Sequence, residues 1–173
     1  MIYEPEEDSY LMLEALKEKL KDKNLKILEI GVGSGFILNG LRILGFANLE
    51  GVDINPEAVD FCKKKKLNVW VSNLFSEVKM KYDVILFNPP YLPKDCNEDS
   101  ESSLITSGGI QGSEILNEFL SKSQNYLLPN GKIYVLISSI TKGINWKGLR
   151  KIKIKEKKLF FEKLEVWELS KSS

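Results

Sequence analysis

The amino-acid sequence predicts an α/β fold in which a mostly parallel, seven-stranded sheet carries helices on both faces. Three observations predict it. The apolar run 26–30 leads through a glycine turn into an apolar helix at 36–44, short apolar runs then alternate with helical segments, and two alternating segments close the chain. A chain of 173 residues can bury a sizeable core, so we expect 1–173 to form one domain.

The composition narrows the class of protein. Hydrophobic residues make up 43% of the chain, yet no apolar run approaches the length of a membrane span, and the first residues lack the basic flank and apolar core of a signal peptide. We therefore predict a soluble, cytoplasmic protein that binds no membrane. With 25 basic and 24 acidic residues, no overall field attracts nucleic acid, and the lysine clusters at 63–66 and 151–158 are typical of solvated faces.

Residue types that are absent also limit the chemistry. The chain has no histidine, which excludes imidazole general bases, Ser-His and Cys-His nucleophile pairs, and histidine metal sites. The two cysteines, Cys62 and Cys96, do not have a metal-binding spacing. The sequence therefore predicts no metal site.

The first strand ends in the glycine turn. Pro5 and the acids after it predict an opening helix, and the strand 26–30 then runs into Gly31, Gly33 and Gly35. A strand, a glycine turn and a helix form the usual nucleotide-binding layout, in which the backbone approaches the ligand. The spacing GxGxG differs from the GxGxxG of dinucleotide enzymes, and Glu29 at the strand end would repel a pyrophosphate. Glu29 instead suits a ligand that carries an ammonium group.

The next two strands end in further polar side chains. The strand 49–52 ends at Asp53, 22 residues after Gly31, where an acid can reach ribose hydroxyls. Asn55 and Pro56 then predict the cap and first position of a helix. The third strand, 68–72, is followed by Asn73, which either meets an adenine amino group or is a turn asparagine.

The fourth strand presents the most informative motif. The run 82–87 is short, β-branched and aromatic, and it ends in Asn88-Pro89-Pro90-Tyr91, just beyond the strand, where ligands bind in open α/β sheets. The side-chain oxygen of Asn88 and the carbonyl of Pro89 can accept hydrogen bonds from a planar nitrogen, Tyr91 can cover its face, and the prolines fix φ. Taken alone, the motif also fits a strand-ending turn with a core tyrosine.

The last elements are a helix at 113–127, a turn at 129–131, a strand at 132–138 and a terminal strand pair from 152 onward. Only 141–150 separate the fifth strand from this pair. That length is too short for a full helix.

In combination, these motifs resemble a known family. Glu29-x-Gly31-x-Gly33-x-Gly35, Asp53 and the Asn-Pro-Pro-Tyr motif resemble class I S-adenosylmethionine-dependent methyltransferases, and the last motif resembles those that methylate planar nitrogens. The segments 3–9 and 53–58 and the glycines of Gly108-Gly109-x-x-Gly112 are similar to the eukaryotic and archaeal branch of HemK-type glutamine methyltransferases. That branch modifies the glutamine of the Gly-Gly-Gln motif in class 1 translation termination (release) factors, and its fold is Rossmann-like.

The resemblance implies a role for each motif residue. It implies that S-adenosylmethionine contacts Ser9, Glu29, Gly31, Gly33, Gly35, Asp53, Ile54, Asn73, Leu74 and Asn88. It implies that the substrate amide contacts Asn88, Pro89, Pro90 and Tyr91, with Asn88, Pro89 and Tyr91 as the catalytic residues. One departure concerns position 73, which is usually Asp in this branch, because Asn keeps an acceptor but loses the charge.

The resemblance also implies a partner, and three other functions remain open. The strand 68–72 is the expected sheet edge, and Val69, Trp70 and Val71 leave it open to pairing. Members of the resembled branch bind a small zinc-binding activator protein that adds a strand at this edge. The rivals are a nucleic-acid adenine or guanine amino methyltransferase, a protein lysine methyltransferase and a non-catalytic scaffold. The chain shows neither a spare recognition domain nor a basic loop beside the motif, which argues against nucleic acid.

Overall fold

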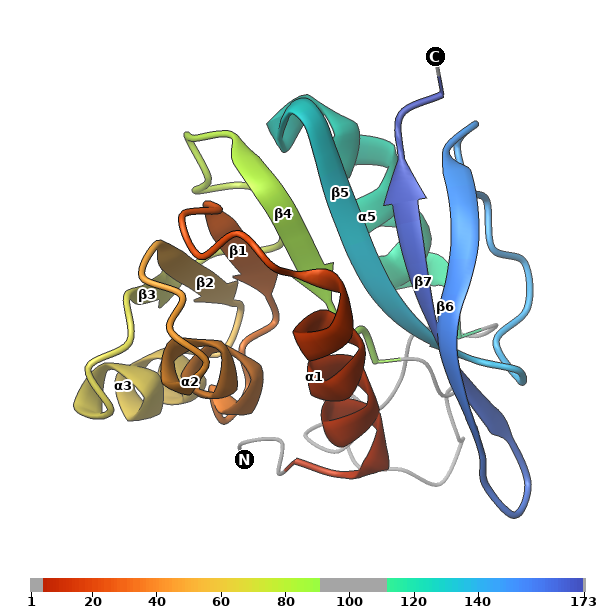
Figure 1. The fold of residues 1–173 in the computed structure, drawn as a ribbon, viewed down its shortest axis with the longest axis horizontal. Helices are drawn as coiled ribbons and strands as arrows, with labels where there is room; N and C mark the ends of the chain where they lie inside the picture. The colour runs from red at the N-terminus through yellow and green to blue at the C-terminus, as the bar shows by residue number, and fades with distance from the viewer. Residues whose placement is uncertain (1–4, 91–111, 173) are drawn as a thin grey trace.

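The computed structural model describes residues 5–90 and 112–172. Figure 1 shows the order of the helices and strands along the chain. The elements are α1 (Glu7–Lys19), β1 (Ile27–Ile30), α2 (Phe36–Ile43), β2 (Leu49–Asp53), α3 (Pro56–Lys64), β3 (Val69–Val71), β4 (Tyr82–Phe87), α5 (Glu114–Ser123), the 3-10 helix η1 (Gln124–Tyr126), β5 (Leu127–Ser138), β6 (Arg150–Lys158) and β7 (Lys163–Ser170).

The seven strands form one sheet in the order β3-β2-β1-β4-β5-β7-β6, which confirms the predicted fold class. Strands β1 to β5 pair in parallel, whereas β7 is antiparallel to both β5 and β6. The strand order reverses between β1 and β4, and in open α/β sheets ligands bind at this switch point, beyond the carboxyl ends of the strands.

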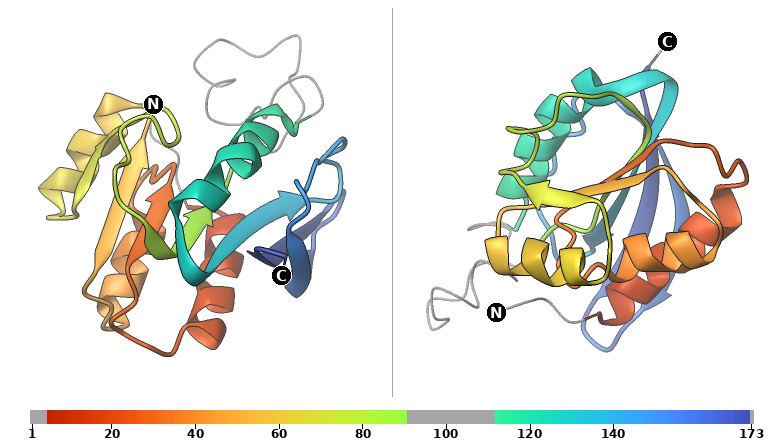
Figure 2. Two further views of the ribbon diagram at one scale, coloured as in Figure 1. Left: turned by 90° about the horizontal axis from the view of Figure 1, so that it is seen from above. Right: turned by 90° about the vertical axis from the view of Figure 1, so that its left-hand side faces the viewer.

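Helices cover both faces because the central strands are apolar on both sides. In β4, Val84 and Leu86 pack with residues of α1 and α2, whereas Ile85 and Phe87 pack with residues of α5. This alternation follows from the two-residue period of a strand. Figure 2 shows the two helical layers on opposite sides of the sheet.

The boundaries of two predicted elements differ in the structure. The helix predicted at 113–127 ends at Ser123 and continues as the 3-10 turn. The fifth strand begins at Leu127 rather than at 132, and its pairing with β4 shifts after Tyr82 where Asn130 adopts a positive φ of 65°. The described stretch 139–149 contains no helix, as its length predicted.

The two edges of the sheet are protected differently. At the β6 edge, Lys153, Lys155 and Lys157 form ion pairs with acidic side chains, so a lysine-rich strand closes this side. At the other edge, β3 pairs with β2 alone among the described strands and carries no lysine or proline. Within the described ranges, the structure has no helix that is long and apolar enough to cross a membrane.

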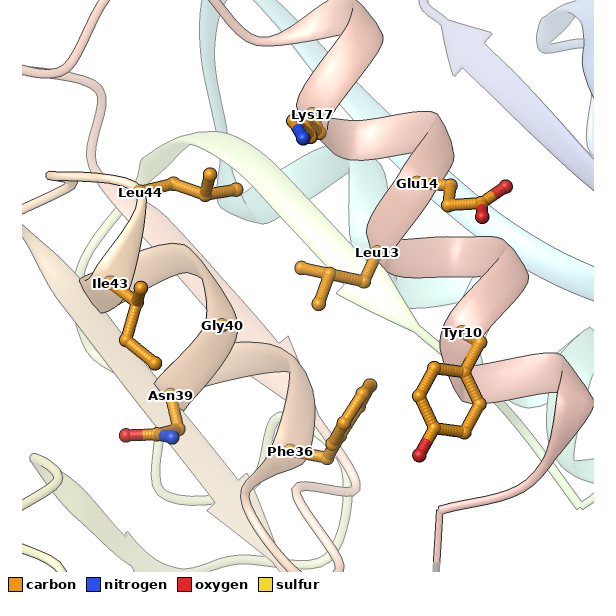
Figure 3. A pocket seen from close by; sticks show the side chains of 9 residues that line it. All are labelled: Tyr10, Leu13, Glu14, Lys17, Phe36, Asn39, Gly40, Ile43 and Leu44. Atoms are coloured by element: carbon orange, nitrogen blue, oxygen red, sulfur yellow. The ribbon is translucent and has the colours of Figure 1, made fainter.

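A surface groove separates α1 from α2 (Figure 3). The two helices approach closely at Gly40, where an added Cβ would lie 2.5 Å from a methyl carbon of Leu13. None of the residues predicted to bind cofactor or substrate lines this groove. It is lined by Tyr10, Leu13, Glu14, Lys17, Phe36, Asn39, Gly40, Ile43 and Leu44.

Candidate active site

Three predicted site residues meet at the carboxyl edge of the sheet. Ile30 is in register with both Val52 and Phe87, so the residues that follow these three lie side by side. They are Gly31, Asp53 and Asn88, which belong to three motifs far apart in the sequence. The parallel register therefore assembles the site that the sequence predicted only in pieces.

The glycine turn folds around the carboxylate of Asp53. Gly33, which has a φ of +50°, donates its backbone N–H to Asp53 Oδ2 at 2.9 Å, and Asn55 donates its N–H to Oδ1 at 2.9 Å. Asn55 also caps α3 as predicted, because its side chain accepts the N–H of Glu57 at 3.0 Å. Each oxygen of Asp53 retains a free lone pair, so this half-buried carboxylate can also accept hydroxyl groups.

Glu29 is a buried acid with an unused oxygen. Its side chain is 2% exposed, and Oε2 has no hydrogen-bond partner among the described residues. Burial raises the pKa of the Glu29 carboxyl well above its usual range, and the nearby charge of Asp53 also raises it, while a backbone hydrogen bond from Leu38 opposes the shift. A cationic ligand group would satisfy Oε2 and favour the ionised form, as the sequence argument for an ammonium group requires.

Asn88 is held in one orientation by a buried carboxylate. Its Nδ2 donates to Asp8 Oδ2 at 3.1 Å, and Asp8 is 2% exposed. An ionised carboxylate only accepts hydrogen bonds, so it takes the NH₂ end of the amide and leaves the oxygen end facing away. That oxygen, Asn88 Oδ1, is buried and has no partner in the described part of the chain. An unsatisfied buried acceptor costs free energy, which a donating ligand recovers.

Asp8 is the site residue that sequence reasoning missed. The sequence explains it as one of several acids in the first turn of α1, and nothing in that pattern separates it from its exposed neighbour Glu7. In the structure Asp8 also accepts the backbone N–H of Ser9 at 2.5 Å and its hydroxyl at 3.2 Å. Asp8 therefore links a predicted cofactor contact, Ser9, to the predicted substrate contact, Asn88.

The remaining predicted residues lie around this centre. Leu74 is buried, with a φ of +49°, and its carbonyl accepts the Ser72 hydroxyl at 2.9 Å, whereas Asn73 and Ile54 are exposed. Pro89 is buried and Pro90 is half-buried. Tyr91 lies outside the described residues.

The charge of the site indicates its ligand. Asp8, Glu29 and Asp53 are three acids at or beside one edge, and no described lysine or arginine donates to the side chains of Glu29 and Asp53. Such a site disfavours phosphates and suits a ligand with positive charge. The site can therefore hold a cationic cofactor beside an acceptor for an N–H group.

Comparison with known proteins identifies the family of the chain. The methyltransferase small domain family matches residues 4–151. A putative protein N5-glutamine methyltransferase of Methanocaldococcus jannaschii is 45% identical over 148 residues, which cover 81% of this chain and 74% of the relative. Methyltransferase HEMK2 of Homo sapiens is 28% identical over 193 aligned positions, which cover 99% of this chain and 90% of the relative.

A solved structure extends the likeness to the whole fold. It is that of the E. cuniculi Mtq2–Trm112 complex, described as responsible for methylation of the eRF1 translation termination factor. The superposition has a TM-score of 0.79 at 25% identity and covers 99% of both chains. These matches show that the chain belongs to the methyltransferase small domain family and is a methyltransferase related to a protein N5-glutamine methyltransferase.

Proposed function

We propose that this chain transfers a methyl group from S-adenosylmethionine to a glutamine side-chain amide in a class 1 translation termination factor. The glutamine is that of the factor's Gly-Gly-Gln motif. The observation that carries this proposal is the buried oxygen Asn88 Oδ1, which has no partner in the described chain and is oriented by Asp8. The names of the similar proteins, glutamine methyltransferases among them, support the same substrate class.

The acidic edge fits the cofactor. S-adenosylmethionine supplies a methyl group on a positively charged sulfur, together with an ammonium group and ribose hydroxyls. We assign the ammonium group to Glu29, the ribose hydroxyls to Asp53 and the close backbone approach to the turn Gly31, Gly33 and Gly35. Further contacts are assigned to Ser9, Ile54, Asn73, Leu74 and Asn88.

The substrate residues act by orientation. A glutamine amide is a poor nucleophile because its lone pair is conjugated with the carbonyl. Asn88 Oδ1 and the Pro89 carbonyl would accept hydrogen bonds from its two N–H groups and would hold the nitrogen toward the methyl group that the cofactor would supply, with the neutral thioether as the leaving group. The nitrogen becomes acidic as that bond forms, and its proton is then lost to solvent. No strong base is required, in keeping with a chain without histidine.

Charge pairing favours a protein over a nucleic acid as substrate. Of the five lysines on β6, three form ion pairs in the structure: Lys153 pairs with Glu156 and Glu165, Lys155 pairs with Glu14 and Glu18, and Lys157 pairs with Glu7. The charges of these three lysines are therefore balanced by acids, so β6 does not present a continuous basic face to phosphates. The neutral acceptor Asn88 Oδ1 suits an amide N–H, and a flat amide fits between acceptors better than the tetrahedral ammonium of lysine.

Methyl transfer from labelled cofactor to the purified termination factor tests this function. We expect label on the parent factor and none on a factor whose Gly-Gly-Gln glutamine is replaced. Asn88→Ala should abolish transfer while cofactor affinity stays within a few-fold, because Asn88 chiefly orients the substrate. Label on RNA or DNA controls instead of the factor would overturn the assignment, as would near-parental transfer by Asn88→Ala.

We also propose a small activator protein as partner at the edge strand β3, within the segment 68–72. The Mtq2 neighbour is a complex with Trm112, and β3 is an unprotected edge suited to added-strand pairing. Trp70 is half-buried against the core, whereas Val71 is 44% exposed, so Val71 is the side chain to probe. A zinc-binding activator and a cytoplasmic location are part of this proposal.

A further inference from the structure

The turn between β6 and β7 presents two exposed phenylalanines. Phe160 is 92% exposed and Phe161 is 88% exposed, and their rings meet edge to face with centroids 4.6 Å apart. They occupy the middle of the turn closed by the hydrogen bond from Leu159 N–H to the Glu162 carbonyl at 2.8 Å. We call Phe160 and Phe161 the aromatic tip.

Folding does not explain the aromatic tip. The central positions of turns usually carry glycine, proline, asparagine, aspartate or serine, and neither phenylalanine adopts a positive φ that would restrict the choice. Because both side chains are almost fully exposed and contact mainly each other, they contribute almost nothing to the core. Beside them, Lys158 and Lys163 face each other in register, and like charges in this arrangement destabilise a strand pair. Glu162 lies in the same turn, but its carboxylate accepts the Ser138 hydroxyl, so the phenylalanines are flanked by Lys158 and Lys163. An exposed apolar centre with a polar rim is typical of a binding surface.

The base of this turn is firmly held, so the aromatic tip has a fixed position. Lys163 N–H donates to Ser139 Oγ at 2.9 Å, and Ser139 N–H donates to the Lys163 carbonyl at 2.8 Å. Leu159 packs against the core. Together these contacts attach the turn to the end of β5.

The aromatic tip lies at the same end of the molecule as the active site. In Figure 1 the loop between β6 and β7 projects from the end at which β4 terminates. The contacts agree, because Lys157 pairs with Glu7, and the next residue, Asp8, is hydrogen-bonded to Asn88. Strand spacings and rises place the tip roughly 20 Å from Asn88. A standard protein interface is wide enough to span that distance.

From these observations we infer that the aromatic tip is a docking site for the protein substrate. This inference rests on the proposed function and adds a second contact region to it. The tip binds an apolar patch with an acidic rim on the termination factor, away from the motif that carries the glutamine. The Asn88 site then receives only the glutamine amide, and the tip supplies affinity for the whole factor.

The test compares rates of methyl transfer at increasing concentrations of the whole factor, with the enzyme form that is active, alone or with its activator. For the double change Phe160→Ser and Phe161→Ser we expect KM to rise by at least about tenfold, as for aromatic hot spots, while kcat stays within about twofold. Phe160→Tyr with Phe161→Tyr keeps the aromatic surface and should retain the parental KM. Ile43→Ser is the matched control, because Ile43 is 77% exposed in the last turn of α2, which leads away from the site edge.

Each outcome decides the inference. An unchanged KM in the double serine variant refutes docking at the tip while leaving the proposed function intact. A parent enzyme that transfers no methyl group to the factor refutes both together. Phenylalanines flanked by lysines also suit a lipid surface, so sedimentation with vesicles containing phosphatidylserine is measured in parallel. Loss of vesicle binding with an unchanged KM assigns the tip to a membrane and overturns the inference.

Discussion

Replacing Asp8 by alanine should slow methyl transfer without preventing cofactor binding. The change removes the carboxylate that accepts Asn88 Nδ2 at 3.1 Å and that fixes which end of the amide faces the substrate. Without it the Asn88 amide can turn, and its acceptor oxygen is no longer held toward the glutamine N–H. Asp8 therefore acts through Asn88, as a positioning residue.

The structure sets the size of the effect. Asp8 is buried and Asn88 is half-buried, so solvent screens the hydrogen bond between Asp8 Oδ2 and Asn88 Nδ2 only in part. A hydrogen bond to a charged group contributes about 1.5–3 kcal/mol, which corresponds to a loss of about 10- to 150-fold in kcat/KM. Asp8→Asn keeps the size of the side chain and one acceptor, so its loss should be smaller than that of alanine.

Initial rates with the termination factor measure this loss, and calorimetry measures cofactor affinity separately. The matched control is Glu7→Ala, which removes the adjacent acid and only an exposed ion pair with Lys157. Exposed pairs contribute little, so this variant should stay within about twofold of the parent. If folded Asp8→Ala transfers methyl at the parental rate, Asp8 does not position Asn88.

Three further changes test the proposed cofactor-binding residues and the edge strand β3. Asp53→Ala should weaken cofactor binding by about 10- to 150-fold, since charge-assisted bonds to ribose are lost, and unchanged affinity in calorimetry removes Asp53 from the site. The pKa of Glu29 is raised, so the stability of the cofactor-free protein falls as pH rises from the ordinary value of 4.5 toward the raised pKa. Glu29→Gln should abolish this decrease in stability, measured as Tm against pH, and should weaken cofactor binding. A variant whose Tm changes with pH as in the parent contradicts this. Val71→Lys should block co-purification with the activator, and parental yield of the complex refutes edge pairing.

The sequence by itself determined the architecture and the main motifs. Runs such as 82–87, apolar on both faces, can be stable only between two helical layers, and the structure places helices on both sides of β4. The order of motifs along the chain also predicted which residues meet. Gly31, Asp53 and Asn88 each follow a parallel strand, and carboxyl ends of parallel strands share one edge.

Only the tertiary structure decided the roles that depend on distant pairing. Asp8 and Asn88 are 80 residues apart, and no local pattern distinguishes Asp8 from Glu7, because both suit the first turn of a helix. The burial of Glu29 and the ion pairs of Lys153 and Lys155 on β6 likewise arise from neighbours supplied by other elements. Periodicity in the sequence shows which face of an element is apolar. The three-dimensional packing decides which buried polar atoms form hydrogen bonds within the described chain and which, like Asn88 Oδ1, do not.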